Sequence, residues 1–181
     1  VIFLPAIAVA RGVETMTGQN MGADEPDRAE RAAGLAATVL FGVLSAAGIL
    51  VFFVAAPIAD VFTTDPAVVD VAAQFLRYVA LTFGFIGIMR AYTGSFRGAG
   101  KTLTAAAISV LMLGLVRFPI AWVAAGEIGE TGIWLAFAVS NVVGAVVAYA
   151  WYRRGTWREG DLTGDGVDLD DPALEPATTD D

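Results

Sequence analysis

The run AAGLAATVLFGVLSAAGILVFFVAA, from Ala32 to Ala56, contains no charged residue and only two hydroxyl side chains. It exceeds the ~20 apolar residues with which a helix crosses roughly 30 Å of bilayer hydrocarbon. Its alanines and glycines allow neighbouring helices to approach closely. The run therefore predicts a transmembrane helix, which Pro57 closes.

Three further apolar runs of similar length follow, at residues 68–92, 103–125 and 131–152, and a shorter one covers residues 1–10. The chain starts inside that shorter run, with no basic region and no small-residue cleavage site. We therefore expect a helix that has lost its beginning, rather than a signal peptide. Together the runs predict an all-α polytopic transmembrane helix bundle with four complete spans and one truncated helix.

Among the connectors between these runs, only alternate ones carry basic residues. The basic connectors and the end of the last run hold Arg28, Arg31, Arg97, Lys101, Arg153, Arg154 and Arg158. The other two connectors, residues 57–67 and 126–130, hold no Lys or Arg. Because cytoplasmic loops of membrane proteins are enriched in these residues, the asymmetry predicts that the basic connectors and the C-terminus face the cytoplasm.

The composition supports a membrane protein with a separate tail. Hydrophobic residues make up 56% of the chain, above the ~45–50% of ordinary soluble domains. Residues 1–155 carry ten basic and ten acidic residues, whereas residues 156–181 carry one Arg and nine acids. We expect a transmembrane portion at residues 1–155 and an acidic, disordered cytoplasmic tail at residues 156–181. Such acidity also favours a halophilic source.

Cysteine and histidine are both absent. The chain therefore lacks a disulfide framework, a thiolate nucleophile and the usual ligands of zinc, haem or iron–sulfur centres. The spans also hold no paired carboxylates for acid–base or nucleophilic work. We expect no enzyme, no metal centre, no cofactor and no nucleic-acid partner.

Polar side chains inside the spans are costly and should face a cavity or the bundle interior. Candidates to line a cavity or bind a substrate are Gln74, Arg77, Arg117 and Asn141. Asn141 lies ~15 Å along its span, close to the midplane. For Arg117, pairing with loop carboxylates is the alternative. We expect Arg90, near the cytoplasmic end of its span, to extend its charge to the membrane surface.

Short sequence motifs lie in the connectors and at the ends of the spans. They are GQNMGA at residues 18–23 with PDRAERA after it, FRGAGKTLT at 96–104, VRFPIAW at 116–122, TGIWLA at 131–136 and WYRRGTW at 151–157. In this order and spacing they resemble the C-terminal lobe of the multidrug and toxic compound extrusion (MATE) family, over about residues 1 to 158. The resemblance implies half of a two-lobed transporter, from the end of the eighth of twelve helices through the twelfth.

The motif residues Gly18, Gln19, Gly22, Arg97, Gly98 and Gly100 are candidates for gating. The first helix is expected to end at Gly18. In GQNMGA, the glycines favour a tight turn and close backbone approach, and Gln19 is expected to bond exposed backbone groups. Glu14 is a possible ion-linked acid, although an ion pair with Arg11 would account for it. Some branches of the family place a coupling aspartate where this chain has Ile86, so the resemblance implies coupling by aspartates of the N-terminal lobe.

The resemblance implies a secondary active exporter at the plasma membrane, which exchanges cationic or amphipathic organic compounds against Na⁺ or H⁺. Its partners would be the missing N-terminal lobe, membrane lipid and small organic solutes. A lipid-linked oligosaccharide flippase of the same superfamily is the alternative, favoured by the arginines inside the spans. A non-transporting membrane scaffold is a further alternative, which the polar residues inside the spans argue against.

Overall fold

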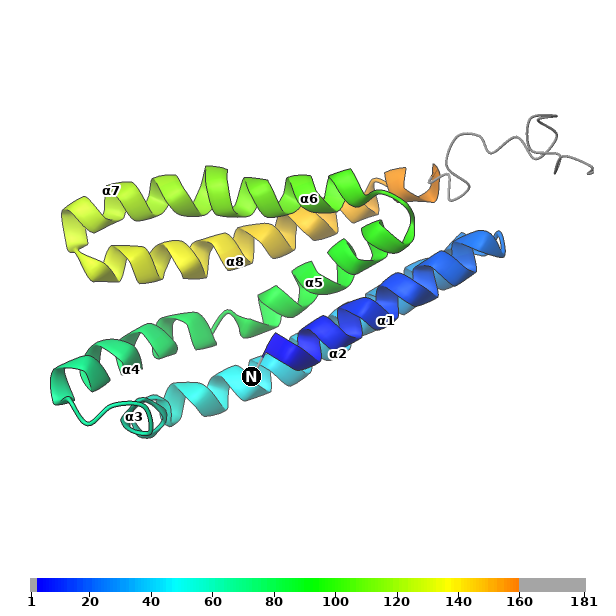
Figure 1. Cartoon of the computed structure of the whole chain (residues 1–181). Helices are drawn as coiled ribbons and strands as arrows, with labels where there is room; N and C mark the ends of the chain where they lie inside the picture. Colours follow the sequence, from blue (N-terminus) through cyan, green and yellow to red (C-terminus); the bar gives the residue numbers. More distant parts are fainter. Residues whose placement is uncertain (1–2, 160–181) are drawn as a thin grey trace, which may run out of the picture.

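The computed structural model describes residues 3–159, which form an elongated bundle of helices (Figure 1). In chain order these are α1 (Phe3–Gly22), α2 (Pro26–Phe53), α3 (Ala55–Asp60), α4 (Pro66–Ala80), α5 (Phe83–Gly98), α6 (Thr102–Val110), the π-helical η1 (Leu111–Arg117), α7 (Phe118–Ile128), α8 (Glu130–Arg153) and the 3₁₀ turn η2 (Thr156–Glu159). The predicted acidic tail lies outside the described residues, except for residues 156–159.

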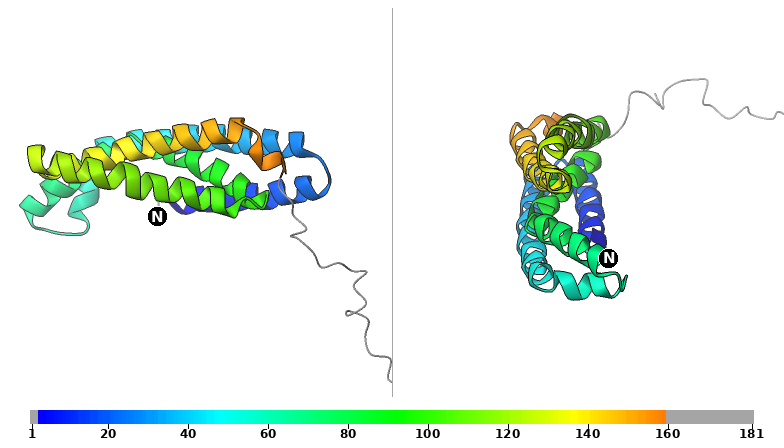
Figure 2. Two further views of the ribbon diagram at one scale, coloured as in Figure 1. Left: turned by 90° about the horizontal axis from the view of Figure 1, so that it is seen from above. Right: turned by 90° about the vertical axis from the view of Figure 1, so that its left-hand side faces the viewer.

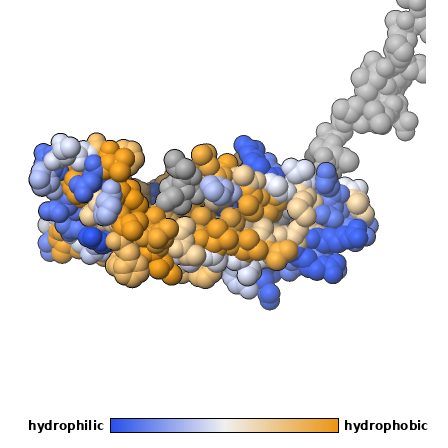
Figure 3. Space-filling model, turned by 90° about the horizontal axis from the view of Figure 1, so that it is seen from below, coloured by the Kyte–Doolittle hydropathy of each residue, from blue (hydrophilic) through white to orange (hydrophobic). Residues whose placement is uncertain are grey.

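Three continuous helices are long and apolar enough to cross a membrane: Pro26–Phe53, Thr102–Ile128 and Glu130–Arg153. A bent pair, α4 with α5, makes a fourth span if it crosses as one unit. The helices run side by side along the long axis (Figure 2). On the face shown in Figure 3, an apolar belt lies between two hydrophilic ends. The predicted all-α transmembrane bundle is confirmed.

The prediction of one continuous helix over residues 68–92 is wrong, because the span breaks at Leu81 and Thr82. The axes of α4 and α5 differ by 53°. The Thr82 hydroxyl donates to the Val79 carbonyl at 2.7 Å, so the break leaves that buried acceptor satisfied. No proline lies at the site, Gly84 follows two residues later inside α5, and apolar periodicity alone could not locate the break.

The first helix also continues past Gly18, where we expected it to end, and reaches Gly22. The turn that follows places Asp24 in the left-handed region with φ 56°. GQNMGA therefore forms the last helical turns of α1 rather than a tight loop. Glycine tolerates a helical backbone, and here Gly18 serves close packing: a Cβ on it would lie 3.3 Å from the Gly98 carbonyl oxygen.

The crossing of α1 and α5 is closely packed because glycines face backbone. A Cβ on Gly94 would come within 2.5 Å of the Ala10 carbonyl oxygen, and one on Gly98 would collide with the Glu14 carbonyl. Beside these contacts, the buried hydroxyls of Thr17 and Ser95 lie 3.0 Å apart. Ser95 also donates to Tyr152 of α8 at 3.1 Å, which ties three helices together.

The turn between α1 and α2, the turn between α5 and α6, and the end of α8 lie at one end of the bundle (Figure 1). At this end the Trp157 ring stacks on Tyr152, with centroids 4.8 Å apart. Arg158 forms ion pairs with Glu30 and with Asp27, the latter at 2.9 Å. These bonds raise the pKa of the Arg158 guanidinium, Glu30 contributing most. These ion pairs link η2, which follows α8, to α2.

Candidate functional site

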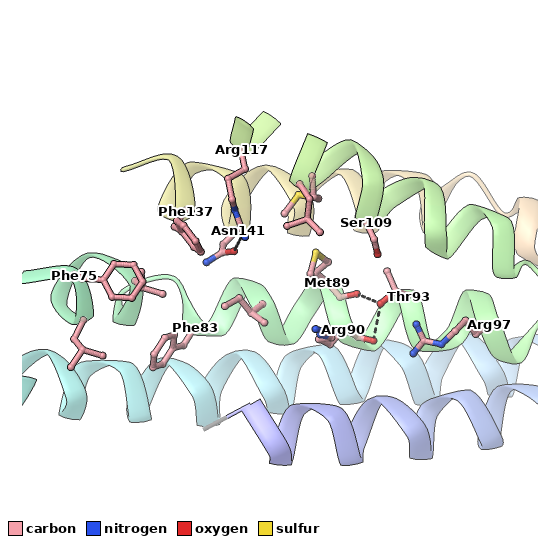
Figure 4. Close-up of a pocket in the computed structure, with 15 residues that line it drawn as sticks. Phe75, Phe83, Met89, Arg90, Thr93, Arg97, Ser109, Arg117, Phe137 and Asn141 are labelled. Atoms are coloured by element: carbon pink, nitrogen blue, oxygen red, sulfur yellow. Dashed lines mark hydrogen bonds between the residues drawn. The ribbon is translucent and has the colours of Figure 1, made fainter. Parts of the chain in front are cut away.

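A cavity of about 390 Å³ lies between α4 and α5 on one side and α6, η1 and α8 on the other (Figure 4). Its wall is mainly apolar, with Phe75, Phe83, Met89 and Phe137 among its side chains. The polar residues that line it are Arg90, Thr93, Arg97, Ser109, Arg117 and Asn141. A few polar groups in a mostly apolar wall are typical of sites for small organic molecules.

Arg117 is the central polar group on the η1 side of the cavity. Its Nε donates to the Ser140 hydroxyl at 2.8 Å, and a terminal nitrogen donates to the Asn141 side-chain oxygen at 3.1 Å. The guanidinium carbon also lies 4.1 Å from the centre of the Phe137 ring. The predicted alternative of a loop carboxylate as partner is therefore wrong: the hydrogen-bond partners of Arg117 among the described residues are neutral.

The network continues from Asn141 to the break between α4 and α5. The Asn141 amide donates to the Thr82 hydroxyl at 2.9 Å, and both residues are buried. Arg117 is thus linked through Asn141 to the residue at which the bent span changes direction. These hydrogen bonds link η1, α8 and the break between α4 and α5 beside the cavity.

The backbone around Arg117 explains how an arginine comes to point into a helical interface. Leu111–Arg117 is π-helical, and Pro119 follows two residues later. Proline removes a backbone donor and crowds the carbonyl four residues before it, here that of Leu115. Single π-helical turns are frequent at functional sites, where they redirect side chains.

The opposite wall carries Arg90, Thr93 and Arg97 on successive turns of α5 (Figure 4). The Thr93 hydroxyl bonds to backbone carbonyls of its own helix. Arg97 donates to Glu14 of α1 at 3.1 Å, and both side chains are about a quarter exposed. Glu14 also pairs with Arg11 at 3.5 Å, so the acid bridges two arginines. Arg90 is exposed.

The cavity wall has a one-sided charge. Three arginines line it, and no Asp or Glu belongs to the lining residues. Within residues 3–159, no group of three or more His, Cys, Asp or Glu side chains lies close enough to hold a metal ion. The position where the resemblance would put a coupling aspartate is Ile86, which is buried and lines the cavity.

Arg117, Asn141 and Arg97 all line this one cavity. Gln74 and Arg77 are not among its lining residues, since their helix turns Phe75, Leu76 and Val79 toward it. Gln74 is exposed and Arg77 is half-buried.

The remaining predicted motif residues lie toward the polar end of the bundle. Gln19 and Gly22 are exposed on the last turns of α1. The side chain of Gln19 has no hydrogen bond in the described part of the chain, in contrast to our expectation. Gly100 has φ 75°, which glycine adopts without strain, at the turn into α6.

Sequence reasoning missed the roles of Thr82, Ser140 and Phe137. Thr82 anchors the network at the helix break, Ser140 accepts from Arg117, and Phe137 lies beneath the guanidinium. The spacing of Phe137 and Asn141, four residues apart on one helix, could have indicated a shared face. No comparable pattern marks Thr82, because its role depends on the break.

The chain matches a protein-family model described as MatE over residues 1–123. It is 25% identical over 158 residues to "Probable multidrug resistance protein YpnP" of Bacillus subtilis, covering 87% of this chain and 36% of that protein. It is 24% identical to "FAD transporter" of Shewanella oneidensis, covering 85% of this chain and 34% of that protein.

The fold also matches solved structures of MATE transporters. A crystal structure of the Vibrio cholerae MATE transporter VcmN in the bent form superposes with a TM-score of 0.80 at 23% identity, covering 89% of this chain and 37% of that one. The chain spans about a third of the length of these relatives. By sequence and by fold, the chain belongs to the MatE family of membrane transporters, which are not enzymes, and is itself a multi-pass membrane protein.

Proposed function

We propose that the chain is the C-terminal part of a longer secondary active exporter of organic compounds. The cavity beside Arg117 carries this proposal, because its size and mostly apolar lining suit the recognition of varied organic molecules. The names of the relatives, a multidrug resistance protein and an FAD transporter, support the same class of cargo. The cavity would form one half of a central site between two lobes, as in other repeat-built transporters.

The partner lobe would cover the open side of the cavity. Large apolar side chains of η1 and α7 are exposed, including Leu115, Phe118 and Trp122. In a membrane protein such surface meets either lipid or another part of the protein. We infer that an N-terminal lobe of the same protein and membrane lipid share it.

The basic end of the bundle faces the cytoplasm in this proposal, and with it the end of α8. The charge asymmetry between the two sets of connectors supports this orientation. Ala23→Cys and Thr64→Cys, in a background without other cysteines, test it by labelling with a membrane-impermeant maleimide in intact cells. Thr64→Cys should react from outside and Ala23→Cys only after permeabilisation. The reverse pattern would contradict the orientation.

Energy coupling would depend on Na⁺ or H⁺ binding outside this chain's cavity. A coupling ion shifts a conformational equilibrium only if its affinity differs between the two states, and a buried acid provides such a site. Among the described residues no acid lines the cavity, and Ile86 occupies the position where some branches of the family have a coupling aspartate. We infer that the coupling carboxylate belongs to the N-terminal lobe.

Transport by the complete protein in proteoliposomes tests the proposal. Ethidium and flavin mononucleotide, one a cation and one an anion, would be followed by fluorescence under an imposed Na⁺ or proton gradient. Accumulation of either compound that collapses with the gradient is the expected result. If neither compound moves faster than in protein-free vesicles under either gradient, the chain is not part of such an exporter.

A lipid-linked oligosaccharide flippase is the second candidate. The observation that favours it is the gathering of Arg90, Arg97 and Arg117 around one cavity, since arginines bind phosphates well. Gradient-driven movement of a fluorescent lipid-linked sugar, with none of the soluble compounds, would establish this candidate instead.

A further inference from the structure

Two of the three cavity arginines have no carboxylate partner among residues 3–159. Arg97 pairs with Glu14, a carboxylate that it shares with Arg11. Arg117 bonds only to the neutral side chains of Ser140 and Asn141, and Arg90 takes part in none of the ion pairs of the described chain. The cavity therefore retains positive charge.

The guanidinium of Arg117 is held in place before any ligand arrives. Hydrogen bonds to Ser140 and Asn141 fix one side of it, and its flat face rests on Phe137. A guanidinium carries five N–H donors, and two of them account for these bonds. The remaining donors have no partner among the described residues and are available to a molecule in the cavity.

An arginine that lacks a counter-charge is costly at membrane depth. The neutral partners of Arg117 orient its charge without cancelling it. Around it the wall is mainly apolar, which strengthens the attraction between a guanidinium and an anion relative to bulk water. An anionic group on the cargo would supply the missing counter-charge where the apolar wall strengthens its attraction to Arg117.

We propose that this cavity binds amphipathic organic anions, with a phosphate or carboxylate at Arg117 and Arg90 and the apolar part against the phenylalanines. Arg117 and Arg90 line the same cavity from opposite walls, η1 and α5. Planar carboxylates and phosphates accept paired hydrogen bonds from arginine. The inference rests on the proposed function and narrows the expected cargo from cationic or amphipathic compounds to anionic amphipaths.

Flavin mononucleotide and riboflavin provide a matched pair of probes, because they differ only by the phosphate. Quenching of their fluorescence by the purified complete protein gives the two dissociation constants. We expect flavin mononucleotide to bind at least about tenfold more tightly, since hydrogen bonds between charged groups are stronger than those between neutral groups. Equal affinities for the two flavins would overturn the inference.

Arg117→Gln should weaken binding of flavin mononucleotide by about tenfold and leave that of riboflavin unchanged. Arg90→Gln should act in the same direction without a folding defect, because Arg90 is exposed. The matched control is Arg154→Gln, an exposed arginine outside the cavity, which should bind both flavins as the unaltered protein does. Loss of riboflavin binding in parallel, or unchanged flavin mononucleotide binding in both cavity variants, would contradict the proposed anion site.

The anion could belong to a soluble molecule or to a lipid, and competition separates these sources. Displacement of flavin mononucleotide by a polyisoprenyl phosphate at lower concentration than by inorganic phosphate would assign a lipid source, and the reverse order a soluble one. The inference and the proposed function fail separately. Tight phosphate-dependent binding without gradient-driven transport would refute only the exporter, whereas transport of ethidium with no preference for flavin mononucleotide would refute only the anion site.

Discussion

Two sides of α5 differ in how they meet their neighbours. Toward α1, Gly94 and Gly98 bring two helix backbones into contact, with no room for even a methyl group. Toward η1 and α8, the same helix carries Arg90 and Met89 and borders a cavity of about 390 Å³. One helix therefore combines a closed contact and an open one.

The difference shows which residues close an interface between membrane helices and which keep it open. Small residues let backbones approach, so dispersion forces and buried hydroxyl pairs such as Thr17 with Ser95 hold the closed side. On the open side, Arg117 lies over the Phe137 ring, and both side chains border the cavity. We infer that the closed side acts as a rigid unit and that ligand binding is confined to the open side.

The closed side should be the most sensitive to added volume. Gly98→Ala places a methyl group against the Glu14 carbonyl, which cannot move aside without shifting α1. We expect a loss of about 3 kcal/mol, the upper end for overpacked interiors, measured as thermal unfolding of the complete protein in detergent. Gly22→Ala is the control, since open space surrounds that helical glycine. Equal melting temperatures for the two variants would show that the contact is not tight.

Disrupting the polar network on the open side of α5 should have the second-largest effect on stability. Asn141→Leu keeps the number and branching of the side-chain heavy atoms but removes the acceptor of Arg117 and the donor to Thr82, both largely shielded from water. The expected loss is about 2 kcal/mol. Asn20→Leu is the matched control, because the Asn20 side chain bonds only to a carbonyl of its own helix, and should change stability by less than about 0.5 kcal/mol. Comparable losses of stability in both variants would contradict a stabilising role for this hydrogen-bond network.

The ion pair between Glu14 of α1 and the cavity-lining Arg97 should have a smaller effect on stability. Glu14→Gln removes the charge opposite Arg97, and since both groups are partly exposed we expect a loss of about 1 kcal/mol. Gradient dependence of transport should persist, because the coupling acid is proposed to lie in the N-terminal lobe. Uncoupled transport in a Glu14→Gln variant that reaches the membrane normally would move the coupling site into this chain.

The smallest effect should come from the polar end of the bundle. Arg158→Gln breaks the pairs with Asp27 and Glu30, which are largely exposed. We expect a loss of about 0.5 kcal/mol that vanishes at high salt, because exposed ion pairs are screened. A loss of stability above about 2 kcal/mol, or one independent of salt, would mean that these ion pairs are shielded from solvent.

The helical spans could be predicted from sequence because long apolar runs with polar connectors have few alternatives in a bilayer. The break at Thr82 could not be predicted, since it depends on a hydroxyl partner and on packing against α2, where Gly48 and Gly84 let the helices approach closely. The end of α1 was misplaced for the opposite reason. Gly18 was interpreted as a helix stop, whereas its role is to admit the backbone of α5.

The cavity was predictable only in part. The cost of polar groups at membrane depth singled out Arg117 and Asn141, and both line it. The same reasoning favoured Gln74 and Arg77, which lie outside it, because position along a helix does not say which face meets another helix. The bend between α4 and α5 was likewise not predictable from the apolar pattern.

The most direct test of the account is gradient-driven transport by the complete protein with its cavity filled. Leu113→Trp adds volume to a cavity-lining side chain, while Leu115→Trp makes the same substitution two residues later on the exposed outer surface of η1. We predict that transport falls at least about tenfold in Leu113→Trp and is retained in Leu115→Trp, at equal amounts of folded protein. Equal transport by the two variants would contradict the claim that cargo passes through this cavity.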